Sequence, residues 1–447
     1  MIKMIRIGSG AGFSGDRLDP AVILAEKGNL DYLVLECLAE RTIALAQKRK
    51  SQNPLMGYDS LLEKRLELLL PIIKKKKVRI ITNMGAANPI GAAEKVVEIA
   101  NRLNIRIKVA AVTGDDVLKL IDRNGLTLET NEPLSHFGNV ISANAYLGVE
   151  TMLPALETDA QVIITGRVAD PSLFVAPMVH HFGWSLDDVD KIAQGTVIGH
   201  LLECGGQVAG GYFADPGKKE VSKLAELGFP FADVKEDGTA IITKVEGTGG
   251  VINLATVKEQ LLYEVTNPHQ YVTPDVIADF TSVHLQEIKL NQIQVSGGTG
   301  IPRPETLKVS VGYEAGVIGE GEISYAGSNA LERAKLASEI LYKRLKDKVV
   351  DLRIDYIGIS SVHRVSFQES APYEIRLRVA GKCLTSKEAA KIGEEVEALY
   401  TNGPAGGGGA RKYVNEVVGI ISTLISRNKI ETHLTLKESL TNEKEII

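Results

Sequence analysis

The sequence predicts an α/β protein with a mainly parallel sheet flanked by helices, followed by a C-terminal α+β domain. Within the first 170 residues, apolar segments run directly into turns rich in glycine and polar residues at five places, and segments of helical apolar spacing separate them. From about residue 276, this strand–helix pattern gives way to segments rich in β-branched residues with alternating apolar and polar side chains. We therefore expect an α/β domain over residues 1–275 and an α+β domain over residues 276–447.

The five apolar segments of the first domain are the predicted parallel strands. They are Ile5–Ile7, Tyr32–Leu35, Val78–Thr82, Val109–Val112 and Val162–Thr165. Helices are expected between them and after them, over Pro20–Lys27, Leu38–Lys50, Tyr58–Lys76, Pro89–Leu103, Ser142–Ala155, Pro171–Phe182 and Leu186–Glu203. Parallel strands end at one edge of their sheet, where open α/β sheets bind ligands, so the five turns predict the site.

The second domain is expected to alternate antiparallel strands with helices. Strands are predicted over Thr281–Val295, Glu305–Tyr313, Gly316–Tyr325, Leu352–Ile359 and Glu374–Val379, and helices over Ser328–Lys348, Ser386–Tyr400 and Tyr413–Ile425.

Composition limits the classes of partner. A net charge of −5 argues against nucleic acid, and no apolar run is long enough to insert into a membrane. The three cysteines are widely spaced and form no CxxC pair, and the amino terminus enters a strand without the anatomy of a signal peptide. We expect a cytoplasmic location, and a homo-oligomer because cytosolic enzymes of this size commonly assemble.

The first two turns carry candidate acid–base groups. Glu36 follows the second strand, where burial would raise its pKa and make it a general base. Asp16 is a candidate acid partner behind a glycine-rich loop, and Arg17 and Asn83 are candidate substrate-binding residues. Cys37 is an alternative nucleophile, or else a buried cysteine without chemistry.

The later strand ends add charged candidates. Arg167 lies between glycine and proline in its turn and suits bidentate binding of a carboxylate or phosphate, so Arg167→Ala is expected to weaken ligand binding with little loss of stability. Asp170 is a candidate acid or a helix start. Asp115 and Asp116 are candidate Mg²⁺ ligands or, for Asp115, a helix cap.

A glycine run far along the chain is expected to join the site. The loop over residues 403–411 contains Gly406, Gly407, Gly408 and Gly409 and ends at Arg411. If a helix follows, loop amides and the helix N-terminus would form an anion cradle. The alternative is a flexible linker.

Several stretches resemble the acyclic terpene utilisation (AtuA) family. They are GSGAGFSGDR (residues 8–17), DYLVLECLAE (31–40), TNMGAANP (82–89), TGRVADPSL (165–173), GHLLECGG (199–206) and TNGPAGGGGAR (401–411). The resemblance implies a cytosolic catabolic enzyme for branched carboxylates or their CoA esters, with CoA as part of the substrate. It supplies no catalytic residues.

The combined hypothesis is acid–base chemistry of lyase, hydratase or isomerase type on a small carboxylate or acyl-CoA. Glu36 would be the base, Asp16 or Asp170 the acid, and Arg17, Arg167 and Arg411 the anion binders.

Two alternatives stay open. A nucleotide- or Mg²⁺-dependent enzyme is one, because residues 10–15 fit GxGxxG after a strand and the paired carboxylates Asp115 and Asp116 could hold Mg²⁺. Separately, His200 and Cys204 lie four residues apart on a helix and could share a metal ion. A non-catalytic acyl-CoA-binding subunit or scaffold is the other.

Overall fold

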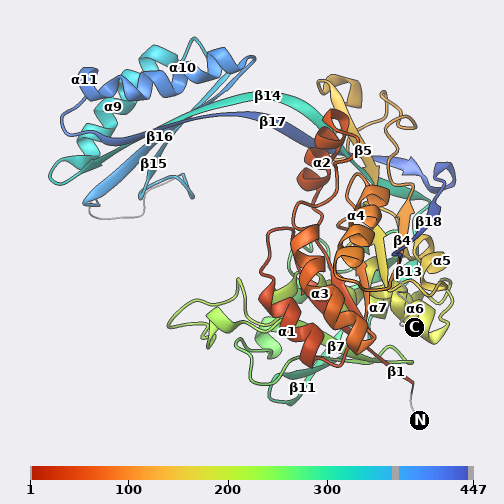
Figure 1. Cartoon of the computed structure of the whole chain (residues 1–447). Helices are drawn as coiled ribbons and strands as arrows, with labels where there is room; N and C mark the ends of the chain where they lie inside the picture. The colour runs from red at the N-terminus through yellow and green to blue at the C-terminus, as the bar shows by residue number, and fades with distance from the viewer. Residues whose placement is uncertain (1–2, 365–371, 441–447) are drawn as a thin grey trace, which may run out of the picture. The chain divides into compact units, whose positions relative to one another are not determined.

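The computed structural model describes residues 3–364 and 372–440 (Figure 1). The chain forms two compact units. Unit 1 contains Met1–His136, Ile141–Gly312 and Ile420–Ile447, and unit 2 contains Phe137–Val140 and Tyr313–Gly419. Residues 276–312 and 420–447, which were expected in the second domain, therefore lie in unit 1. The segments 284–296 and 433–438 there pair with the first domain's sheet and become part of it.

Unit 1 is built on a ten-stranded mixed sheet of order β11-β12-β8-β7-β1-β2-β3-β6-β4-β18. Its parallel centre comprises β1 (Met4–Ala11), β2 (Tyr32–Leu35), β3 (Arg79–Thr82), β6 (Val162–Thr165) and β4 (Lys108–Thr113). Antiparallel strands flank it: β7 (Pro230–Lys235), β8 (Ala240–Lys244), β12 (Gln292–Ser296), β11 (His284–Lys289) and β18 (His433–Glu438). The predicted parallel sheet is thus confirmed in the centre, and the whole sheet is mixed.

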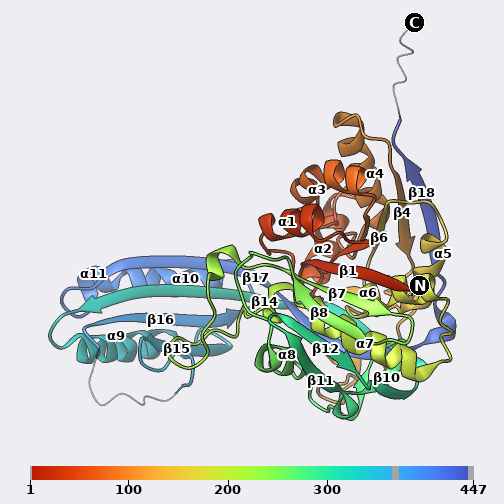
Figure 2. The ribbon, with the colours of Figure 1, turned by 90° about the horizontal axis from the view of Figure 1, so that it is seen from below.

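Helices cover both faces of the parallel centre (Figure 2). The helices of unit 1 are α1 (Asp19–Lys27), α2 (Glu40–Gln52), α3 (Leu62–Lys76), α4 (Pro89–Arg102), α5 (Leu153–Leu156), α6 (Ser172–Phe182), α7 (Val189–Glu203) and α8 (Leu254–Leu261). Leu33 and Ile80 join one apolar cluster with α1, α3 and α4, while α6 and α7 contact the sheet through β1, β2 and β7. Burial on both faces explains why these strands read as continuous apolar runs.

A small second sheet packs beside α7 in unit 1. It contains β9 (Tyr271–Val272), β10 (Val276–Asp279) and β13 (Thr299–Pro302), and both β10 and β13 contact α7. This sheet brings Tyr271 against the ring of His200 on α7, with 5.1 Å between ring centroids.

Unit 2 is an α+β arrangement around strands of order β15-β16-β14-β17. The strands are β15 (Asp351–Ile357), β16 (Glu374–Cys383), β14 (Thr306–Ala326) and β17 (Gly408–Ser426). The first residues of β14 (306–312) and the last residues of β17 (420–426) belong to unit 1, as does nearly all of β5 (Val140–Ala145), which pairs with β14. The helices are α9 (Ala330–Leu345), α10 (Ser386–Glu397) and α11 (Leu399–Asn402). Alternate residues of β16, such as Leu377 and Val379, are buried with α9 and α10 in one core.

Three sequence predictions of secondary structure are wrong. The expected helix Tyr413–Ile425 is part of strand β17, because its many β-branched side chains suit a pleated surface. The expected helix Ser142–Ala155 is mostly the strand β5 and a short turn before α5. The two strands expected around Gly316 form the single strand β14.

Within residues 3–364 and 372–440, no helix combines the length and the apolar character that crossing a membrane requires.

The close packing of Gly319 in unit 2 leaves no room for a side chain at this position. A Cβ added there would lie 2.0 Å from the carbonyl oxygen of Ala389 in α10, so the helix would have to move. Gly319→Ala should lower stability by about 1–3 kcal/mol, measured as a fall in melting temperature. Gly408→Ala is the matched control, because a Cβ there has no atom within 4 Å. Equal melting temperatures for both variants would contradict this packing.

Candidate active site

The parallel strands bring their carboxyl-terminal turns to one edge of the sheet. Asn83, after β3, donates from Nδ2 to Glu36 Oε1 at 2.9 Å, and its Oδ1 accepts from the Cys37 amide at 2.7 Å. The Arg167 amide, after β6, donates to Asp115 Oδ2, after β4, at 2.9 Å. The predicted meeting of these turns is therefore confirmed.

Glu36 is a buried carboxyl at the end of β2. Both of its donors, the Leu38 amide at 2.7 Å and Asn83 Nδ2, bond to Oε1. Burial raises the pKa of Glu36 and outweighs the opposing influence of Arg167 and the two hydrogen bonds. Asn83 therefore orients the candidate base, and the second carboxyl oxygen, Oε2, stays available for a proton.

Arg167 is buried, with 1% of its surface exposed, and its guanidinium bonds to protein acceptors. Nε donates to Val168 O at 2.8 Å, Nη1 donates to Leu38 O, and Nη2 donates to Val168 O and Asp170 Oδ1. The guanidinium carbon of Arg167 lies 4.4 Å from the centroid of the Tyr146 ring. This arrangement favours a positioning role, in contrast to the substrate-anion binding expected from the sequence.

Asp16 and Arg17 also bond within the protein. Asp16 accepts the Gly12 amide at Oδ2, 2.9 Å, and the Arg17 amide at Oδ1, 2.8 Å. Arg17 Nη1 donates to Ala225 O at 3.0 Å. With both carboxyl oxygens accepting backbone amides, Asp16 stabilises the loop after β1, and this geometry does not support the predicted acid role.

The GxGxxG stretch is explained by packing. Gly10 lies inside β1, and a Cβ at Gly12 would lie 2.3 Å from the carbonyl carbon of Cys204. Gly12 therefore permits the loop to approach the end of α7. The close neighbour of this glycine is the protein's own backbone, where a dinucleotide fold would place a pyrophosphate.

Glu203, at the end of α7, is a second buried carboxyl, and it was not among the acid–base candidates expected from the sequence. His200 Nδ1 lies 2.8 Å from Glu203 Oε1 in a buried pair, while Glu203 Oε2 and His200 Nε2 have no hydrogen-bond partner among the described residues. Burial raises the pKa of Glu203, against the effect of His200. The helical spacing of three residues between His200 and Glu203 was the available signal.

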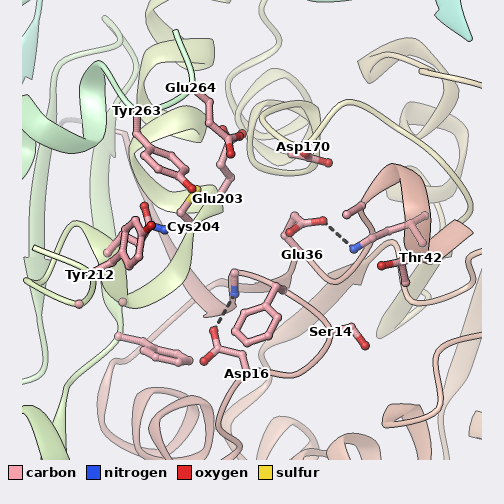
Figure 3. A pocket seen from close by; sticks show the side chains of 18 of the residues that line it. Ser14, Asp16, Glu36, Thr42, Asp170, Glu203, Cys204, Tyr212, Tyr263 and Glu264 are labelled. Atoms are coloured by element: carbon pink, nitrogen blue, oxygen red, sulfur yellow. Dashed lines mark hydrogen bonds between the residues drawn. The ribbon is translucent and has the colours of Figure 1, made fainter. Parts of the chain in front are cut away.

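Gly12, Asp16, Glu36 and Glu203 line a pocket of about 640 Å³, which we call the carboxyl pocket (Figure 3). Its acidic lining comprises Asp16, Glu36, Glu40, Asp170, Glu203 and Glu264, and no lysine, arginine or histidine is among the described lining residues. Aromatic side chains complete it, with Phe13, Tyr212, Phe229 and Tyr263. The pocket therefore combines proton-transfer groups with apolar surface and repels anions.

Glu40, the first residue of α2, is a member of this lining whose pKa is lowered. Burial would raise its pKa, but the Tyr146 hydroxyl, which donates to Oε1 at 2.5 Å, the Glu40 backbone amide and the charges of Lys308 and Arg167 lower it to about 2. Lys308 Nζ lies 3.4 Å from the same oxygen. Glu40 is thus a fixed negative charge at neutral pH.

The alternative nucleophile and metal assignments gain no support. Burial raises the pKa of Cys37 well above its usual range and that of Cys204 to about 12, so neither thiolate is favoured. Asp115 bonds to Arg167 and Asn144, and Asp116 Oδ2 accepts from Gln47. In the described part of the chain, no three His, Cys, Asp or Glu side chains are grouped to hold a metal ion.

The glycine run belongs to unit 2, unlike the residues of the carboxyl pocket. Gly406 has φ +72°, and a Cβ at Gly407 would lie 2.9 Å from Ile323 Cδ1. Gly408 and Gly409 begin strand β17, on which Arg411 is exposed. Because a strand follows the run, the helix N-terminus required for the predicted anion cradle is missing.

Removing the Arg167 side chain should destabilise unit 1. Arg167→Ala leaves buried carbonyls without a donor and Asp170 without its cation, so we expect a loss of roughly 3 kcal/mol in urea denaturation. Arg17→Ala, at an exposed arginine, should leave the midpoint nearly unchanged. An Arg167→Ala variant with normal stability and lost ligand binding would restore the anion-binding role.

Asp115 predicts a defined pH dependence of stability. Burial raises its pKa from 3.8 to about 6, so between these values the folded protein holds a proton that the unfolded chain releases. The extra proton stabilises the folded protein. This stabilisation is fully present below about pH 4 and is lost as the pH rises through about 6, a change of roughly 3 kcal/mol in the free energy of unfolding. Asp115→Asn should remove it, seen as the difference between wild-type and variant denaturation curves across this range. Parallel curves would contradict the assignment.

Comparison with known proteins gives one finding. No curated protein and no solved structure matches the chain. The family model described as "Acyclic terpene utilisation family protein AtuA" matches residues 5–436, nearly the whole chain. The chain therefore belongs to the acyclic terpene utilisation (AtuA) family.

Proposed function

We propose that the chain is an acid–base enzyme of lyase, hydratase or isomerase type that acts on a branched acyl thioester. The observation that carries this proposal is the pair of buried carboxyls, Glu36 and Glu203, which line one pocket and have raised pKa values. Raised pKa values bring a carboxyl closer to the working pH of a general acid or base.

The hydrogen bonds of Glu36 and Glu203 suggest which carboxyl acts as the base and which as the acid. Glu36 is the proposed base, because Asn83 and the Leu38 amide hold Oε1 and leave Oε2 for the substrate. Glu203 is the proposed acid partner in place of Asp16, because its Oε2 accepts no hydrogen bond from the described residues. Asp170 lines the pocket with Oδ1 paired to Arg167, and it is proposed to orient the substrate.

The charge of the pocket favours a thioester over a free carboxylate. A carboxylate substrate would meet six acidic side chains without a lining cation. The acyl end of a CoA ester carries no charge, so it can enter this pocket without that repulsion. When the Glu36 carboxylate takes the α-proton, its negative charge passes to the enolate of the thioester, and Glu203 as the acid would protonate that enolate.

A divalent-cation-dependent enzyme remains the alternative to test, although no three His, Cys, Asp or Glu side chains of the described residues are grouped to hold the ion. Mg²⁺ is often bound through one or two carboxylates with several waters. Addition of MgCl₂ after EDTA treatment distinguishes it, because only this candidate requires the ion for activity. A cytoplasmic location and a homo-oligomeric state are part of the proposal, and three free cysteines suit a reducing compartment.

Glu36→Gln should abolish proton removal. We expect wild-type protein in D₂O to incorporate deuterium into one or more branched acyl-CoA thioesters, detected by mass spectrometry, and the corresponding free acids to exchange far less. Glu36→Gln should reduce the exchange rate roughly 10²–10⁴-fold, and Glu203→Gln should slow turnover with less effect on exchange.

The control is Glu98→Gln, a substitution on the outer surface of α4. It should exchange like the wild type. Equal exchange by the Glu36→Gln variant would overturn Glu36 as the base, and preferential exchange of free acids would overturn the thioester assignment.

A further inference from the structure

A second pocket of about 510 Å³ adjoins the carboxyl pocket in unit 1. The two share Glu40 and Asp170 among their lining residues. Away from these two carboxyls, the second pocket is lined mainly by aliphatic, proline and tyrosine side chains, among them Leu128, Val272 and Leu424. We call it the apolar pocket. Its size falls within the range of roughly 300–1,000 Å³ that small-molecule sites occupy.

Three large apolar side chains are left exposed at this pocket. Val272 is 62% exposed, Leu128 53% and Leu424 51%. They come from segments far apart in the sequence, and a cluster of exposed apolar side chains around a cavity is typical of a binding site.

The walls are fixed by hydrogen bonds. The Leu128 amide donates to Ser422 O at 2.9 Å, and Thr423 Oγ1 donates to Leu126 O at 3.0 Å, which joins two walls. Arg427, the residue after β17, donates to Pro274 O and to Glu150 and so holds the end of β17 against the segment after β9. The pocket is therefore built before a ligand arrives.

The boundary with the carboxyl pocket is charged and held in place. Lys308 and the Tyr146 hydroxyl fix Glu40, and Arg167 fixes Asp170. Tyr271, which also lines the apolar pocket, packs on His200, the partner of Glu203. A ligand that fills both pockets would thus place its polar part beside the proton-transfer groups and its apolar part beside Val272.

We propose that the apolar pocket binds the hydrocarbon chain of the substrate whose reacting group occupies the carboxyl pocket. This inference rests on the proposed function for the identity of the reacting group. It names the substrate class as an acyl compound with an extended apolar chain. Specificity for chain length then comes from Val272, Leu128 and Leu424.

Direct binding of n-hexanol, n-octanol and n-decanol, measured by calorimetry, tests the pocket without any activity. Wild-type affinity should rise about fourfold for each added methylene, the value expected from burial of ~0.8 kcal/mol per CH₂. Val272→Asp places a charge against the chain and should weaken n-decanol binding about tenfold or more. Because Val272 is largely exposed, the variant should fold. Leu290→Asp, at a side chain 79% exposed and outside both pockets, should bind like the wild type.

The outcomes separate the two proposals. Absent alkanol binding by wild type, or equal binding by Val272→Asp, overturns the apolar pocket whatever Glu36 does. Alkanol binding that Val272→Asp abolishes, together with a flattened dependence of deuterium exchange on acyl-chain length, supports it. Unchanged chain-length dependence in Val272→Asp would show that the pocket serves another ligand and overturns the inference. Glu36→Gln should bind n-decanol like the wild type, so a failed proton-exchange assay leaves this measurement intact.

Discussion

The buried guanidinium of Arg167 is the interaction on which the geometry of the site depends. It joins Leu38 O, after β2, to Val168 O and Asp170, after β6, across 129 residues of sequence. It also lies against the ring of Tyr146, whose hydroxyl bonds to Glu40. Its charge opposes the raised pKa values of Glu36 and Glu203. Several carboxyls can line one pocket because this cation lies behind them and every one of its nitrogens has an acceptor.

The sequence predicts the position of these residues more successfully than their roles. Apolar strands followed by polar turns located Glu36, Asn83 and Arg167 at one sheet edge, because the direction of parallel strands follows from strand–helix alternation. The role of Arg167 depends on which acceptors surround it after folding, and no spacing rule contains that information. Glu203 was missed as an acid for a similar reason, since its neighbour Glu36 lies far away in the sequence.

The glycine residues show the same limit. The run before Arg411 and the GxGxxG match both suggested backbone amides directed at a ligand. In the structure, Gly12 and Gly407 leave room for Cys204 and Ile323, which are the protein's own atoms. A glycine requirement identifies a close approach but does not identify what approaches. The predicted anion cradle also required a helix over Tyr413–Ile425, where the structure has strand β17, whose β-branched residues favour a strand.

The pKa values of two carboxyls at one pocket, Glu40 and Glu36, are shifted in opposite directions, so the two groups are suited to different chemical roles. Glu40 accepts from Tyr146 and lies near Lys308, so its carboxylate is stabilised, whereas Glu36 gains less from its two hydrogen bonds than burial costs it. The same pocket therefore holds a permanent negative charge and a carboxyl that can exchange a proton. The permanent charge of Glu40 lines both pockets, and Lys308, which pairs with it, lines the apolar pocket. A hydrocarbon chain beside Glu40 meets no like charge, whereas a free carboxylate at that position would, so these contacts support the proposal of a thioester with an apolar chain over a free acid.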